Sequence, residues 1–137
     1  MIIYPKKFKQ APSANFDGLF DWDFLLSVFE GTNIQPMDID AIIERKGKIL
    51  IFETKDNGKD IPLGQRILLE QIIKIGRGKI HLIIIYGKTP EAITGMDEWY
   101  YSQNGVSKSG IRVVKAREVL ARVSKWFSWA NKESNRR

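Results

Sequence analysis

The chain has 137 residues, of which 43% are hydrophobic and 28% are charged, so it is long enough to bury one core and too apolar to be wholly disordered. Cysteine is absent, which excludes disulfide scaffolds, zinc ribbons and thiol nucleophiles. There are 22 basic and 16 acidic residues, and the net charge of +6 suits a polyanionic partner, although many small basic proteins bind none.

The N-terminal residues lack the apolar core and the small-residue cleavage site of a signal peptide. No apolar run approaches the roughly 18 residues that a membrane-spanning helix requires. We therefore expect a cytoplasmic protein without a membrane partner, in which residues 1–137 form a single domain. The single histidine, His81, begins an apolar run and is expected to be structural, which leaves hydrolytic chemistry to carboxylates, lysine and metal.

The first 15 residues contain prolines and lysines with little periodicity, and we expect an extended arm there. Apolar residues then recur at helical spacing over residues 16–30, which predicts an amphipathic helix ending at Gly31. Acidic residues near the beginning of this helix suit its dipole, and they are Asp17, Asp21 and Asp23.

Residues 38–55 consist of two apolar, β-branched runs around a Lys-Gly pair, a pattern that predicts a β-hairpin. With that pair as the two-residue loop, Asp40 faces Glu53 and Asp38 faces Lys55. Side chains two apart along a strand share a face, so all four polar groups lie together. Directly opposed Cβ atoms are about 4.5 to 5.5 Å apart, which lets two carboxylates reach one cation.

The competing interpretation is an amphipathic hairpin whose acids and lysine form cross-strand salt bridges. However, residues 39–43 and 49–52 are nearly continuous apolar runs, as in strands that are buried on both faces. A charge inside such a sheet is unfavourable unless a partner or a function requires it. Two adjacent carboxylates also repel each other unless a divalent cation or an ammonium group lies close to both. The pattern therefore favours a metal site.

The order Asp40, Glu53, any residue, Lys55 on a hairpin resembles the active-site signature of the PD-(D/E)xK nuclease superfamily. Its spacing is most similar to that of the archaeal Holliday junction resolvases, and the chain also resembles small phage-encoded nucleases. The resemblance implies that Asp40 and Glu53 hold Mg²⁺, for which Mn²⁺ can substitute, and that Lys55 positions or activates the attacking water. Ile39 stands in place of the family's proline, so Asp38 stays an alternative ligand beside Asp40.

The resemblance implies two further site residues. A carboxylate from the first helix often completes the metal site in this family, and Asp21 lies nearest to the corresponding place. In resolvase-like members a glutamine in the following helix supports the site, and Gln65 stands in a similar place. The alternatives are a helix-dipole role for Asp21 and a plain helix-surface position for Gln65.

After the hairpin, Asp60 is placed to cap a helix that has Pro62 in its first turn, runs to about Ile75 and ends at Gly76. The apolar run over residues 80–86 predicts a central strand, parallel to the second strand of the hairpin. The expected fold class is α/β with a mixed sheet flanked by helices, and the resemblance implies a restriction-endonuclease-like core.

The remaining residues predict a loop over 87–95 near the substrate, two strands over 96–102 and 106–114 around Asn104-Gly105, and a last helix over 115–130. Strand aromatics usually pack into cores, although base stacking or a dimer contact are alternatives for Trp99, Tyr100 and Tyr101. The apolar side of the last helix is predicted to contain Val119, Leu120, Val123, Trp126, Phe127 and Ala130.

Together these features predict an Mg²⁺-dependent endonuclease whose partner is DNA. Cutting two strands calls for two sites, which favours a homodimer formed through the last helix or the aromatic strand. Two rival predictions stay open: a DNA-binding or scaffold protein that has the nuclease fold without turnover, and an RNA nuclease. The acidic cluster defines a reaction and not a substrate geometry, so the sequence does not choose among resolvase, restriction-like, exonuclease and nicking activities.

Overall fold

The computed structural model describes residues 20–103 and 105–132. The chain divides into two compact units, one ending at Ile39 and the other beginning at Asp40, and each is described by itself. The predicted arm lies outside the described residues, and the single domain and the cytoplasmic location stay predictions. Within the described ranges, no helix combines the length and the apolar character needed to cross a membrane.

The first unit contains a 3-10 helix, η1 (Trp22–Phe29), in place of the α-helix that was predicted over residues 16–30. Residues 16–19 lie outside the described part of the chain. The Asp21 carboxylate accepts a hydrogen bond of 2.9 Å from the Asp23 backbone N–H and so caps η1. No residue of η1 is buried within this unit, and helical periodicity without a packed face stabilises an α-helix poorly.

The second unit begins with the predicted hairpin, formed by β1 (Ala41–Arg45) and β2 (Lys48–Lys55). The last residue of β1 pairs with the first residue of β2, which confirms the predicted register. The two loop residues, Lys46 and Gly47, have positive φ angles of 51° and 83°. Such angles are typical of a type I′ turn, whose twist matches that of the strands that it joins.

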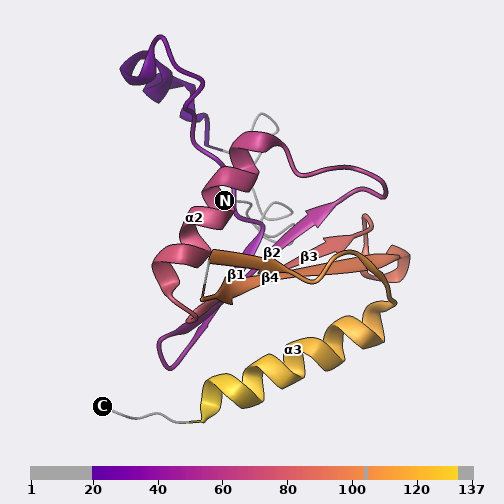
Figure 1. The fold of residues 1–137 in the computed structure, drawn as a ribbon. Coiled ribbons are helices and arrows are strands. Elements are labelled where there is room, and N and C mark those ends of the chain that lie inside the picture. Colours follow the sequence, from indigo (N-terminus) through magenta and orange to yellow (C-terminus); the bar gives the residue numbers. More distant parts are fainter. Residues whose placement is uncertain (1–19, 104, 133–137) are drawn as a thin grey trace, which may run out of the picture. The chain divides into compact units, whose positions relative to one another are not determined.

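The described residues form one six-stranded mixed sheet, so the fold is α/β (Figure 1). β3 (Ile80–Tyr86) is parallel to β2, as predicted. A loop containing the short 3-10 helix η2 (Pro90–Ala92) then leads to β4 (Gly95–Ser102), which is antiparallel to β3. Two short strands, β5 (Gly105–Lys108) and β6 (Arg112–Val113), pair with the other side of β4.

The helix α2 (Leu63–Gly76) connects the parallel strands β2 and β3. Its N-terminus differs from the prediction, because Pro62 is the N-cap and no described side chain, including that of Asp60, caps the helix. Proline suits this boundary since it has no N–H to satisfy and its fixed φ leads into the helix. The first N–H groups of α2 therefore have no side-chain acceptor.

The C-terminus of α2 also differs from the prediction. The left-handed residue that ends the helix is Arg77, with φ of 50°, and its N–H donates to the Lys74 carbonyl at 3.2 Å. Gly76 is the last helical residue instead. A Cβ at Gly76 would collide with the Ile80 side chain, so the glycine is explained by close packing of the helix end against β3.

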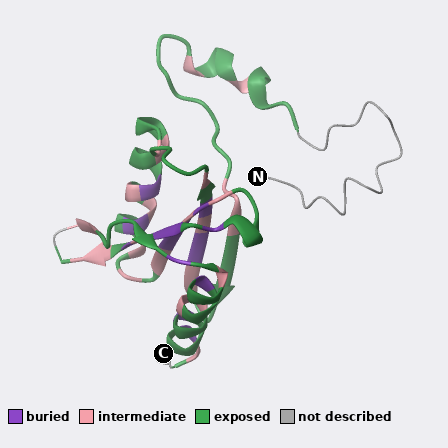
Figure 2. Cartoon of the chain, turned by 90° about the vertical axis from the view of Figure 1, so that its right-hand side faces the viewer, coloured by how far each residue is buried: buried purple, intermediate pink, exposed green. Residues whose placement is uncertain are grey.

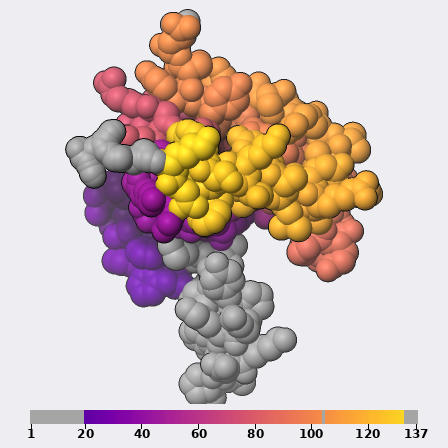
Figure 3. Space-filling view, turned by 90° about the horizontal axis from the view of Figure 1, so that it is seen from below, coloured from indigo at the N-terminus to yellow at the C-terminus, as the bar shows by residue number. Residues whose placement is uncertain are grey.

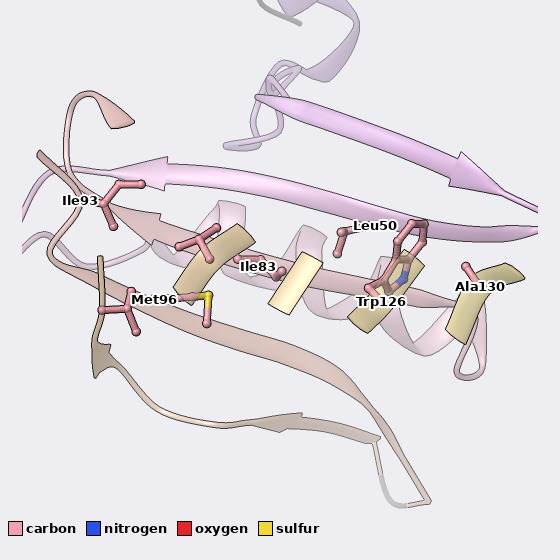
Figure 4. Close-up of a cluster of buried hydrophobic side chains, with 8 residues drawn as sticks. Leu50, Ile83, Ile93, Met96, Trp126 and Ala130 are labelled. Carbon is pink, nitrogen blue, oxygen red and sulfur yellow. The ribbon is translucent and has the colours of Figure 1, made fainter. Parts of the chain in front are cut away.

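The sheet is covered on its two faces by α2 and α3 (Ala116–Asn131), as Figure 1 shows. Side chains alternate along a strand, so Leu50 and Ile83 pack toward α3 while Ile51 and Leu82 point toward α2. Buried residues are concentrated in the central strands between the helices (Figure 2). The core on the α3 side, drawn in Figure 4, contains Leu50, Ile83, Ile93, Met96, Val114, Val119, Trp126 and Ala130.

The apolar side of α3 is narrower than predicted. Lys115 is the N-cap, and the predicted inward residues Val119, Trp126 and Ala130 are buried. However, Leu120 is 69% exposed and Phe127 is 50% exposed. Each directly follows a buried residue, and successive helical residues are rotated by about 100°, so both members of a pair cannot face the sheet. Figure 3 shows the outer side of α3 running across this face of the molecule.

The strand that was predicted over residues 106–114 is interrupted between β5 and β6. The buried Asp97 carboxylate accounts for the break, because its Oδ1 accepts hydrogen bonds from the Gly110 N–H at 3.0 Å and from the Ser109 hydroxyl at 3.3 Å. A buried carboxylate needs such donors, and strand geometry would direct them elsewhere.

The turn before β5 also differs from the prediction. Ser102 pairs with Gly105, so this glycine belongs to β5, while Asn104 lies outside the described residues. Trp99 is buried, and its Nε1 donates to Asp97 at 3.0 Å, which identifies it as a core residue. The adjacent Tyr100 is exposed.

Two leucine-to-alanine substitutions, one at a buried and one at an exposed position, test this arrangement of the core. Leu50→Ala removes a fully buried side chain and should lower the free energy of unfolding by about 2 to 5 kcal/mol. Leu120→Ala is the matched control, since that side chain is exposed and the change should stay within about 0.5 kcal/mol. Urea denaturation followed by circular dichroism measures both, and equal losses would contradict the burial of Leu50 under α3 and the exposure of Leu120 on its outer side.

Candidate active site

The centre of the candidate site is Glu53, near the C-terminal end of β2. Its side chain points to the α2 side of the sheet, and only 4% of the residue is exposed. The Gln65 amide, in the first turn of α2, donates a hydrogen bond from Nε2 to Glu53 Oε2. The structure therefore brings together two of the predicted site residues, and it does so across the interface between a strand and a helix.

Lys55 is the next side chain on the same face of β2. Its Nζ lies 4.0 Å from Glu53 Oε2, and its side chain is partly exposed. Because residues two apart on a strand point the same way, the ammonium group is held between the buried carboxylate and solvent. The predicted proximity of Glu53 and Lys55 is thus present.

Asp40 lies just before β1 and not within it. Its Oδ2 accepts hydrogen bonds from the Thr54 backbone N–H at 2.8 Å and from the Thr54 hydroxyl at 2.9 Å. These bonds hold the aspartate beside the end of β2, next to Glu53. Sequence reasoning missed Thr54, because it occupies the unspecified position of the motif. A hydroxyl residue next to two site residues on one strand was the available signal.

The charge state of Glu53 reflects its surroundings. Burial raises the pKa of Glu53, and the negative charge of Asp40 raises it further. The hydrogen bond from Gln65, the positive charge of Lys55 and the backbone of Asp40 each act to lower the pKa, without reversing the shift. Ionised Glu53 is therefore unfavourable in these surroundings, and an additional cation would stabilise its negative charge.

The donor atoms of the site fit a hard divalent cation. Glu53 Oε1 and Gln65 Oε1 are both buried and have no hydrogen-bond partner among the described residues. Carboxylate and amide oxygens are the ligands that Mg²⁺ prefers, and Mg²⁺ commonly takes only one or two carboxylates from a protein. No group of three or more acidic or histidine ligands occurs within the described ranges, so water and substrate would complete the coordination.

The two other predicted ligands, Asp21 and Asp38, belong to the first unit. The carboxylate of Asp21 caps η1, which agrees with the helix-terminus alternative for that residue. Metal binding by Asp21 and Asp38 stays a prediction, whereas Asp40, Glu53, Lys55 and Gln65 are assembled within the second unit.

His81 lies at the other end of the sheet, on β3 opposite Leu50. Its ring contacts Trp129 edge-on, with 4.9 Å between the ring centroids, and burial lowers the pKa of His81. The histidine is therefore packed against α3 and well removed along the strands from Lys55. This placement agrees with the structural role predicted for it.

Comparisons with protein-family models, with curated proteins and with solved structures find no match to this chain. Membership of the nuclease superfamily accordingly stays a prediction. The chemistry of the site is argued below from its own geometry and charges.

The raised pKa of Glu53 predicts a pH-dependent difference in stability. Ionising a buried carboxylate opposes folding, so Glu53 should destabilise the fold increasingly as pH rises from its ordinary pKa of 4.5 through the raised value. Glu53→Gln should remove this effect, and its stability relative to wild type should increase as the pH rises above 4.5 in EDTA.

Urea denaturation across that pH range measures the difference. Glu91→Gln, at an exposed position in η2, is the control and should show no such trend. A stability difference between Glu53→Gln and wild type that is independent of pH would contradict the assigned electrostatics.

Proposed function

We propose that this protein is a divalent-metal-dependent nuclease that hydrolyses phosphodiester bonds in DNA, and that its sheet is a restriction-endonuclease-like core. One observation carries the proposal. Glu53 is buried and accepts a hydrogen bond from a helix amide at one oxygen, its other oxygen has no partner among residues 20–103 and 105–132, and an aspartate and a lysine lie beside it. This combination of two carboxylates and an ammonium group suits phosphodiester hydrolysis.

In this proposal Asp40, Glu53 and the Gln65 amide oxygen hold the cation. Bound Mg²⁺ or Mn²⁺ would supply Lewis-acid chemistry for the scissile phosphate and for water. Thr54 keeps Asp40 in place through its two hydrogen bonds. Lys55 orients the attacking water and offsets the negative charge that develops on the phosphate.

The overall charge supports a nucleic-acid substrate. The chain carries a net charge of +6, although its proposed site is acidic. A basic surface attracts a polyanion over a distance, and the acidic site then needs a cation before a phosphate can approach it. In this proposal the basic chain and the acidic site are therefore complementary.

A second candidate is a DNA-binding or scaffold protein with this fold and no turnover. The observation that favours it is the small number of acidic ligands, since within the described ranges no third acid or histidine joins the two carboxylates. Metal binding and cleavage separate the candidates, because the second predicts salt-sensitive DNA binding without Mg²⁺-dependent products.

Metal binding should be visible as a thermal shift. Mg²⁺, Mn²⁺ or Ca²⁺ at about 100 times its dissociation constant should stabilise the wild-type protein by about 2.7 kcal/mol and raise its Tm. Glu53→Gln should abolish this shift, because it removes the charge while preserving size. Glu91→Gln is the control and should keep the shift, and a shift that survives Glu53→Gln would contradict the proposed ligand set.

Cleavage should require the same residues. Purified protein is incubated with linear, single-stranded, flap and four-way-junction DNA and with RNA, each with Mg²⁺, Mn²⁺ or EDTA. We expect metal-dependent DNA products from the wild type, and Glu53→Gln and Lys55→Ala should each lower the rate by at least about 100-fold.

The controls for cleavage are Glu91→Gln and Lys79→Ala, which change exposed side chains of the same types. Both should cleave at the wild-type rate, and circular dichroism should show that all variants are folded. Full activity of Lys55→Ala would contradict the mechanism. If only RNA gives products, the substrate is RNA and not DNA. DNA binding without products in any metal would favour the second candidate.

A further inference from the structure

A pocket of about 490 Å³ lies next to the candidate site, where β2 and β3 end. Its walls come from the loop that follows β2 and from Gly87 and Lys88, which follow β3. The two strands are parallel, so their C-terminal ends, and the loops that follow them, lie at the same edge of the sheet. Ligands of α/β proteins typically bind beyond such carboxyl ends, where loops from neighbouring strands meet. Lys55 lines the pocket as well, which places it directly against the candidate active site.

The two loops are connected to each other and to the sheet. The Gly87 N–H donates to the Lys55 carbonyl at 2.8 Å, and the Thr94 hydroxyl donates to the Asn57 side chain. Gly87 has φ of 138°, and a Cβ there would collide with the Ala92 carbonyl. The chain after β3 therefore turns tightly, and the pocket is bounded by restrained loops.

Two lysines of the pocket are available to a ligand. Lys59 and Lys88 are exposed, and no ion pair or side-chain hydrogen bond joins either of them to another described residue. Some other lysines of the second unit are engaged, as Lys108 pairs with Glu70 at 2.7 Å and Lys48 donates to the Ala130 carbonyl. The ammonium groups of Lys59 and Lys88, by contrast, would each gain a partner from an external anion.

The chemistry of the pocket favours a phosphate group. Three lysines, at 55, 59 and 88, and two aspartates, at 56 and 60, line it, so three positive charges minus two negative charges leave +1. The three lysines disfavour a cation in this pocket. Pro62, the N-cap of α2, also lines the pocket, so the positive end of the helix dipole lies close to it and favours an anion.

We propose that this pocket binds a backbone phosphate of the DNA strand, adjacent to the phosphodiester at the candidate active site, with Lys59 and Lys88 as positioning residues. The identification of the ligand as DNA rests on the proposed function. The lysines hold the strand in register with Glu53 and Lys55, and they take no part in the reaction.

The test measures binding and cleavage separately. Fluorescence anisotropy of a short labelled DNA duplex in EDTA compares wild type with the double variant Lys59→Ala, Lys88→Ala at several salt concentrations. Loss of two phosphate contacts should weaken binding about tenfold and reduce the slope of log K against log salt by about 1.8. The matched control is Lys79→Ala, Lys125→Ala, which removes two exposed lysines away from the pocket and should change binding less than about twofold.

Two further readouts identify a positioning role. The variant Lys59→Arg, Lys88→Arg should retain binding, because the charges are kept. With Mg²⁺, the double alanine variant should raise KM and leave kcat within about twofold, as expected when an interaction is equal in the ground and transition states.

The possible results distinguish this inference from the proposed function. If the double alanine variant binds like wild type, or no more weakly than the control pair, while wild type cleaves DNA, the inference falls and the proposed function stands. If wild type neither binds nor cleaves DNA, both fall. If phosphorus NMR shows saturable binding of inorganic phosphate that depends on Lys59 and Lys88, without any effect on DNA binding, the ligand is free phosphate and the inference is overturned.

Discussion

The hydrogen bond between Gln65 and Glu53 is the interaction on which the site depends. A carboxylate that is buried between a sheet and a helix is unfavourable unless donors or positive charge reach it. The amide of α2 satisfies one oxygen, and the Lys55 ammonium lies near the same oxygen. The other oxygen is buried and has no hydrogen-bond partner in the part of the chain that the structure describes, so a bound ligand would supply one.

The topology of the sheet brings the remaining groups to this point. The antiparallel hairpin returns Asp40 to the level of Thr54, where two hydrogen bonds hold it. The parallel crossover through α2 places the end of β3 beside the end of β2, which gathers Lys55 and Lys88 at one edge. A carboxylate site and a basic pocket therefore adjoin each other, although their residues come from four separate segments.

Two of the differences between prediction and structure have the same cause. Periodicity predicts which apolar residues share one face of an element. The contacts of that element in the folded chain decide which of these residues are buried. Leu120 and Phe127 continue the apolar pattern of α3 and yet lie outside the contact with the sheet. In the same way, the buried Asp97 diverts the segment between β5 and β6 from strand geometry, a competition that no local pattern indicates.

Much of the site was predictable because it is local. A two-residue turn and period-two alternation determine the register of the hairpin, and this register places Glu53, Lys55 and Asp40 close together without reference to the remaining chain. The central strand over residues 80–86 was equally clear from its apolar run.

Only the tertiary structure decided which side chains from different helices, strands and loops contact each other. Resemblance selected Gln65, but its bond to Glu53 exists because α2 packs on that face of β2. Thr54 as the anchor of Asp40, and Lys59 and Lys88 as two sides of one pocket, carry no sequence signal of their own. Local periodicity specifies an element and its apolar face, whereas the packing of the whole chain specifies which polar groups from different elements meet.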